Sequence, residues 1–157
     1  MNILGIDPGK CKFGAALVSD AGAILFRCVK RFQINQNADE SAVFNLIYAP
    51  LHEIMSEICS SHAIDAIALG DKTASKDYLN AISLIIKKNE KFGRISLNMV
   101  DESHTTEAAR ALYHKNNPPF FLIRWLPHTM LPVFCDVDDY AAVAIALKFI
   151  KLSLKKA

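Results

Sequence analysis

The sequence predicts an α/β domain in which a mixed β-sheet is covered by helices on both faces. Three short apolar runs joined by tight turns come first, and they predict an antiparallel meander. Later apolar runs alternate with segments whose apolar residues recur every three or four positions, the pattern of amphipathic helices. A meander followed by strands that helices separate is typical of a mixed sheet with both faces covered.

Each element follows from a local pattern. Five strands are predicted from apolar runs that end at turn residues, over 2–6, 13–18, 24–29, 64–69 and 95–100. Four helices are predicted over 41–60, 77–88, 105–113 and 136–154. Pro50 falls inside the first helix and is expected to interrupt and kink it, because proline cannot donate the helical hydrogen bond. Residues 115–132 contain four prolines and are expected to be irregular.

Length and composition fit one globular domain over residues 1–157. Hydrophobic residues make up 52% of the chain, which excludes a disordered protein, and the net charge of +2 is weak evidence for a polyanionic partner. The four cysteines are scattered singly, without metal-ligand spacing, as expected of buried thiols in a reducing compartment. No apolar run approaches the roughly 20 residues that span a bilayer. We therefore expect a cytoplasmic protein with no membrane partner.

Acidic residues follow two predicted strands and open the last predicted helix. Asp7 ends the first strand and Glu102 the fifth, while Asp136, Asp138 and Asp139 begin the helix. If the first, fourth and fifth strands are parallel neighbours, their carboxyl ends share one rim, where sites collect in such sheets. Converging carboxylates ionise together only around a cation, and oxygen ligands suit Mg²⁺ or Mn²⁺. Two such ions, about 3.5–4 Å apart, can hydrolyse a phosphodiester.

Each acid also has an ordinary structural explanation. Asp7 lies in a generic Asp-Pro-Gly turn, and Glu102 could be a surface acid before a helix. Aspartates at a helix start are stabilised by about 0.3–1 kcal/mol each through the helix dipole. The joint placement of the acids is what favours a catalytic interpretation.

Three motifs resemble a known branch of nucleases. The run ILGIDPG at 3–9 resembles the opening of RuvC-like nucleases with the RNase H fold. The run VDE at 100–102, followed by TTEA at 105–108, resembles the second acidic motif of the YqgF (RuvX) family. The run DDYAAV at 138–143 resembles the closing helix of that family. The motifs occur in the family's order and span nearly the whole chain.

The resemblance implies an RNase H-like fold with strand order 3-2-1-4-5, in which the second strand is antiparallel. It implies a divalent-metal-dependent nuclease, with Asp7, Glu102 and Asp138 as catalytic residues that bind Mg²⁺ or Mn²⁺, and it leaves endonuclease and exonuclease action both open. Family members are linked to 5′-end maturation of precursor 16S ribosomal RNA and were earlier proposed to resolve Holliday junctions. We therefore expect a nucleic-acid partner and favour RNA over branched DNA. A homodimer is compatible with the resemblance to resolvases.

The third acid stays open, and two positions depart from the family pattern. The motif favours Asp138, whereas the apolar face of the helix points nearer to Asp139, since adjacent helical residues lie about 100° apart. Asp139 is therefore the second catalytic candidate, and Asp136 paired with Asp139 is a further alternative. Ser103 stands where many relatives have arginine, and the loop at 70–73 lacks the family's proline.

Candidate nucleic-acid contacts surround the same rim. Lysines need only charge and reach to bind phosphates, and hydroxyls at a helix N-terminus favour an anion. The candidates are Lys10, Lys12, Lys72, Thr73, Ser75, Thr105 and Thr106. His104 is close enough in sequence to assist Glu102 in proton transfer, although a surface imidazole is the simpler interpretation. Lys148, Lys151 and Lys155 are interpreted as a solvated helix face.

Two other functions compete with a nuclease. One is a nucleic-acid-binding module that keeps the fold without catalysis, in which substitution of Glu102 leaves binding unchanged. The other is an actin-like or sugar-kinase ATPase, whose first phosphate loop resembles residues 5–9. Such ATPases bind nucleotide between two domains of this kind, and 157 residues are too few for both.

Overall fold

A five-stranded mixed sheet forms the centre of the structure, a computed structural model that describes residues 1–34, 39–72, 74–103, 105–117 and 137–155. Its strands are β1 (Asn2–Asp7), β2 (Lys12–Ser19), β3 (Ile24–Arg31), β4 (Ala66–Gly70) and β5 (Ser96–Val100). Their order is β3-β2-β1-β4-β5, with β2 antiparallel to both neighbours and β1, β4 and β5 parallel. The predicted strand order is confirmed.

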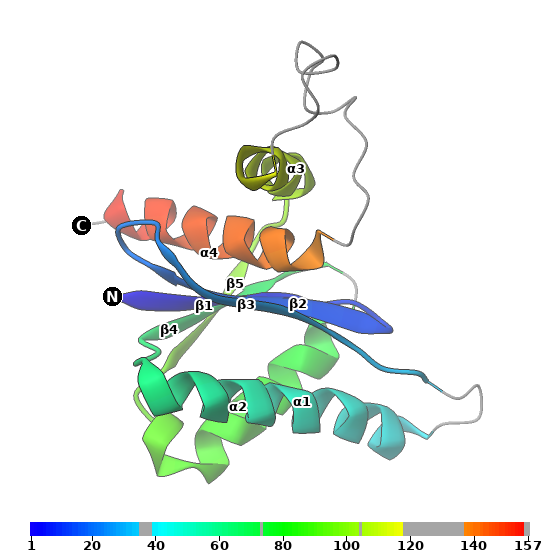
Figure 1. The fold of residues 1–157 in the computed structure, drawn as a ribbon. Helices are drawn as coiled ribbons and strands as arrows, with labels where there is room; N and C mark the ends of the chain where they lie inside the picture. Colours follow the sequence, from blue (N-terminus) through cyan, green and yellow to red (C-terminus); the bar gives the residue numbers. More distant parts are fainter. Residues whose placement is uncertain (35–38, 73, 104, 118–136, 156–157) are drawn as a thin grey trace.

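Helices cover both faces of the sheet (Figure 1). The described helices are α1 (Glu40–Ser61), α2 (Ser75–Lys88), the short 3₁₀ helix η1 (Glu90–Phe92), α3 (Thr105–Asn116) and α4 (Asp138–Leu154). Figure 1 shows α1 and α2 beneath the sheet, α4 above it, and α3 packed on α4 farther from the strands. None of the described helices is long and apolar enough to cross a membrane.

The alternation of side chains along the strands divides the core in two. Leu4 and Ile6 of β1 belong to the cluster that faces α1 and α2, whereas Ile3 belongs to the cluster that faces α4. Gly5 lies on the α4 face, and a Cβ there would come within 2.0 Å of the Ala142 carbonyl oxygen. The absence of a side chain therefore lets α4 lie directly on β1.

The predicted helices exist, but several boundaries and details differ. α1 runs continuously through Pro50, so the expected interruption is wrong. Apolar side chains are buried on both sides of the proline, and this packing outweighs one missing hydrogen bond. α3 continues to Asn116, three residues farther than predicted. Cys11 is exposed, contrary to the expectation of buried cysteines.

Candidate active site

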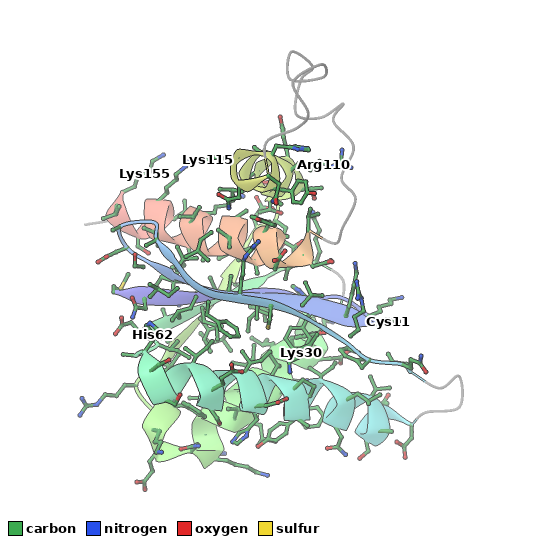
Figure 2. The ribbon with its side chains drawn as sticks, in the orientation of Figure 1. Cys11, Lys30, His62, Arg110, Lys115 and Lys155 are labelled. Carbon is green, nitrogen blue, oxygen red and sulfur yellow. The ribbon has the colours of Figure 1, made fainter. Side chains whose placement is uncertain are left out.

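Asp7 lies at the carboxyl end of β1, in the middle of the sheet. Side chains alternate between the two faces of a strand, so Asp7 points to the same face as Ile3 and Gly5, which is the face covered by α4. Its antiparallel partner is Gly14 of β2, and on the other side the parallel register runs from Ile6↔Leu69 towards Gly70 of β4. Two glycines thus flank Asp7 across the sheet. Cys11, in the turn after β1, marks this end of the sheet in Figure 2.

Gly14 brings the start of α4 next to Asp7. A Cβ on Gly14 would lie 1.9 Å from the Asp138 carbonyl oxygen and 2.9 Å from the Asp139 backbone nitrogen. Only a glycine at this position permits the helix to begin so close to the strand. The first residue of the helix, Asp138, is thereby set beside the cross-strand partner of Asp7.

Gly70 provides the corresponding space for Glu102. A Cβ on Gly70 would lie 2.0 Å from Glu102 Oε1 and 2.7 Å from its Cδ, so the glutamate side chain lies over the end of β4. Glu102 is 6% exposed although it belongs to the loop after β5. Its backbone N–H donates to Asp71 Oδ1 at 3.1 Å, and Thr105 Oγ1 donates to its carbonyl at 2.8 Å. The loop is therefore fixed on both sides of the carboxylate.

Two lysines form ion pairs with Asp138 and Glu102, the two outer carboxylates that lie on either side of Asp7. Lys12 Nζ lies 2.6 Å from Asp138 Oδ2. Lys72 Nζ lies 3.7 Å from Glu102 Oε2, and the Lys72 backbone N–H donates to Oε1 at 3.3 Å. Both lysines were candidates for nucleic-acid contact, and here their side chains bind the acids of the rim.

The three carboxylates influence one another electrostatically. The pKa of Asp7 rises to about 7, first because the carboxyl is withdrawn from water and then because the charges of Glu102 and Asp138 lie nearby. Lys72 and Lys12 oppose this rise. Burial also raises the pKa of Glu102, although the backbone N–H and charge of Lys72 act in the opposite direction. Asp7 is thus the carboxyl whose ionisation the surroundings oppose most clearly, and near neutral pH it holds a proton part of the time.

The donor set fits a hard divalent cation in its chemistry. Three carboxylates surround one end of β1, and ionising Asp7 near neutral pH is unfavourable without added positive charge. As the side chains lie, no three acidic, histidine or cysteine groups among the described residues are grouped as metal ligands. The lysine ammonium groups supply the positive charge instead.

Asp139 and Asp136 are the other two candidates for the third acid. Asp139 points towards β3, where its Oδ2 lies 3.1 Å from Arg27 Nη1, and the Arg27 guanidinium lies 4.3 Å from the Tyr140 ring centroid. The charge of Asp138 contributes to the raised pKa of Asp7, whereas the carboxylate of Asp139 is paired with Arg27. Asp136 lies outside the described residues.

The remaining candidate contacts are dispersed. Lys10 and Thr106 are exposed, while Thr105 is buried and supports the Glu102 carbonyl. Ser75 is half-buried, and its hydroxyl donates to the Asp71 carbonyl at 3.3 Å. Thr73 and His104 lie outside the described residues.

Sequence reasoning missed four residues that shape this site. Gly14 and Gly70 make room for the acids, Asp71 holds the Glu102 amide, and Lys148 binds the loop around Glu102. The register of the glycines opposite and beside Asp7 was a usable signal, since a glycine within a strand indicates close backbone approach. The Asp71 and Lys148 contacts join distant segments and leave no local pattern.

Comparison with known proteins shows the fold. No family model and no curated protein matches the sequence. Among solved structures, RuvC of Thermus thermophilus aligns with a TM-score of 0.64 at 16% identity, covering 99% of this chain and 97% of that chain. The T. thermophilus RuvC complex with a Holliday junction substrate gives 0.63 at 18% identity, with 98% and 96% covered.

A more distant structure has the same extent. Fowlpox virus resolvase, in complex with Holliday junction DNA, aligns with a TM-score of 0.51 at 10% identity, covering 98% of this chain and 99% of that chain. Together with the strand order β3-β2-β1-β4-β5, these similarities show that the chain has the α/β RNase H-like fold.

Proposed function

We propose that the protein is a divalent-metal-dependent endonuclease that hydrolyses phosphodiester bonds at the end of β1. The observation that carries this proposal is the convergence of Asp7, Glu102 and Asp138, of which the central residue has a pKa near 7 because of burial and the other two charges. Glu102 is buried and Asp7 and Asp138 are half-buried, and neighbouring carboxylates withdrawn from water ionise together only at a cost that a bound cation removes. Groups whose pKa is shifted in this way are candidates for functional residues.

In this proposal Asp7, Glu102 and Asp138 hold Mg²⁺ or Mn²⁺. When bound, the ions activate a water molecule and stabilise the leaving oxygen of the phosphodiester. Asp7 lies between the other two acids and binds from the rigid centre of the sheet. Glu102 binds from a loop fixed by Asp71 and Thr105, and Asp138 from the first turn of α4.

Lys12 and Lys72 serve two states of the site in this proposal. In the metal-free protein each ammonium group neutralises an outer carboxylate. With the acids holding divalent cations, Lys12 and Lys72 would be placed to bind the phosphates beside the scissile bond, where positive charge favours a polyanion. Asp139 stays with Arg27 and supports the start of α4.

We propose RNA as the substrate, in a reaction of the kind that trims the 5′ end of precursor 16S ribosomal RNA. The support is the similarity of residues 100–108 and 138–143 to the YqgF family motifs. A four-way DNA junction is the second candidate, favoured by the similarity in fold to RuvC and to the fowlpox virus resolvase, both solved with Holliday junctions.

A cleavage assay with matched variants tests the proposal. Labelled single-stranded RNA, a precursor-like ribosomal RNA end and a four-way DNA junction are incubated with Mg²⁺, Mn²⁺ or chelator. Wild type and Glu57→Gln, which changes an exposed acid of α1, should cleave with metal, whereas Glu102→Gln should not. Cleavage that survives Glu102→Gln contradicts the proposed site. Metal-independent binding without cleavage favours the non-catalytic module.

A further inference from the structure

Lys148 of α4 is bound to the loop that carries Glu102. Its Nζ lies 2.7 Å from the Asp101 carbonyl oxygen and 3.1 Å from the Ser103 carbonyl oxygen. Two side-chain oxygens complete the set, Ser103 Oγ at 3.1 Å and Asp101 Oδ2 at 3.2 Å. An ammonium group has three protons, so these acceptors use its full donor capacity. Lys148 therefore joins the residues on either side of Glu102.

The loop is arranged to receive this cation. The Ser103 backbone N–H donates to Asp101 Oδ1 at 2.8 Å, and the Ser103 hydroxyl donates to Asp101 Oδ2. These bonds close a tight turn that directs the two carbonyls and the carboxylate towards α4.

The contacts of Lys148 differ from those of its neighbours on the helix. The Lys148 side chain is 29% exposed, whereas Lys151, one turn farther on, is exposed. Lys155 extends from the end of α4 into solvent (Figure 2). The interpretation of these lysines as one solvated face is therefore wrong for Lys148, because a long side chain can bind a loop that its helical position does not reveal.

The same helix also supplies Asp138. Lys148 lies ten residues after Asp138, about 15 Å along α4. The helix is fixed at its start by Gly14 and near its middle by Gly5, so it forms a rigid connection between the two acids. A loop attached to α4 through Lys148 keeps a constant position relative to Asp138.

We infer that Lys148 is a positioning residue, which binds the carbonyls on both sides of Glu102 and thereby sets the separation of Glu102 from Asp138. This inference rests on the proposed function, because the separation of Glu102 from Asp138 matters only if both residues bind the metal ions. Residues that orient metal ligands typically change metal affinity or activity about 10- to 100-fold when they are replaced.

Three variants test the inference. Lys148→Met keeps the length of the side chain and removes its charge, Lys148→Arg keeps the charge, and Lys151→Met is the matched control on the same helix. The Glu102 amide, which donates to Asp71, is followed by NMR hydrogen exchange in the metal-free protein. Mn²⁺ affinity is measured by calorimetry, and kcat and KM are measured on the preferred substrate.

We expect Lys148→Met to speed exchange of the Glu102 amide and to weaken Mn²⁺ binding about 10- to 100-fold. The rate constant kcat should fall by a similar factor, while KM stays nearly unchanged because substrate contacts are intact. Lys148→Arg should restore most of each loss, and Lys151→Met should match wild type. Asp101→Asn, which leaves the lysine in place, should change the same readouts in the same direction and covers the case in which Lys148→Met does not fold.

Two outcomes separate this inference from the proposed function. If Lys148→Met lowers the melting temperature but leaves Glu102 exchange and Mn²⁺ affinity unchanged, Lys148 only stabilises the fold and the inference is wrong. If wild type binds no Mn²⁺ and cleaves none of the substrates, the proposed function fails, and the assignment of Lys148 to metal geometry fails with it.

Discussion

The two outer acids of the site reach Asp7 by different structural means. Asp138 is the first residue of a 17-residue helix whose backbone rests on Gly14. Glu102 belongs to a loop, and its side chain, not its backbone, rests on Gly70. A side chain added at Gly14 must therefore displace the backbone of α4. A side chain added at Gly70 displaces only the side chain of Glu102. We expect the first to damage stability and the second to damage the site alone.

The largest effect should come from the residue between the two acids. The pKa of Asp7 is raised from 3.8 to about 7, so the folded state holds a proton there that the unfolded chain loses. In the metal-free protein, stability should therefore fall as pH rises from about 4 to about 7. Asp7→Asn removes this cost and should raise the free energy of unfolding at pH 8 by on the order of 2–4 kcal/mol.

Urea unfolding at pH 5 and pH 8, in the presence of chelator, checks this expectation. Asp77→Asn, which changes an exposed acid in the first turn of α2, is the control and should follow wild type. An Asp7→Asn protein that is no more stable than wild type at pH 8 would show that burial and the two neighbouring acids do not raise the pKa of Asp7. Bound Mg²⁺ or Mn²⁺ should reverse the order, since only the carboxylate binds the cation.

Gly14→Ala should produce the next largest effect. The added Cβ would meet backbone atoms of Asp138 and Asp139, which cannot rotate away. Overpacking of this kind costs about 1–3 kcal/mol, which corresponds to several degrees in Tm for a chain of this length. Calorimetry should show the loss, together with weaker Mn²⁺ binding. Unchanged stability would mean that α4 is not seated on Gly14.

Gly70→Ala should leave stability nearly intact while it impairs the site. The added Cβ would meet the far end of Glu102, and that side chain can rotate towards solvent. We expect a change below about 1 kcal/mol in unfolding free energy. Mn²⁺ affinity should nevertheless fall at least about tenfold, because a ligand has moved. Equal losses of stability in the two glycine variants would remove the distinction between the helix and the loop.

The two lysines should give the smallest effects on stability. Both ion pairs are partly exposed, so each is worth about 0.2–1 kcal/mol. Lys12→Met should cost more than Lys72→Met, since the Lys12 contact is 2.6 Å and the Lys72 contact is 3.7 Å. Either change should raise the pKa of Asp7 further, which carboxyl NMR titration measures. An unchanged Asp7 titration in both variants would contradict the assigned electrostatics.

Local patterns predicted more of the fold than of the site. Alternation and helical periodicity identified the strands and helices, and the resemblance supplied the sheet order, so the ends of β1, β4 and β5 meet as predicted. The third acid was left open because the apolar face of α4 pointed nearer to Asp139. In the structure Arg27 of β3 binds Asp139, and that partner is 112 residues away in sequence.

The same limit applies to Lys148 and Asp71. Helical period groups Lys148 with Lys151 and Lys155, and only the folded chain brings the loop at 101–103 to it. Asp71 follows β4 as an ordinary turn residue, yet its carboxylate accepts a hydrogen bond from the Glu102 backbone N–H, 31 residues away in sequence. Residues that position others through tertiary contacts are not visible in local sequence patterns.

The side chain of Glu102 occupies the volume that a Cβ at position 70 would need. A side chain at position 70 and an inward-facing glutamate at position 102 are therefore incompatible, because both would need the same space. Among related sequences, these two positions should vary together, and a residue larger than glycine at 70 should accompany loss of the acid at 102. Such a pair would distinguish catalytic from non-catalytic relatives by inspection of two columns in an alignment.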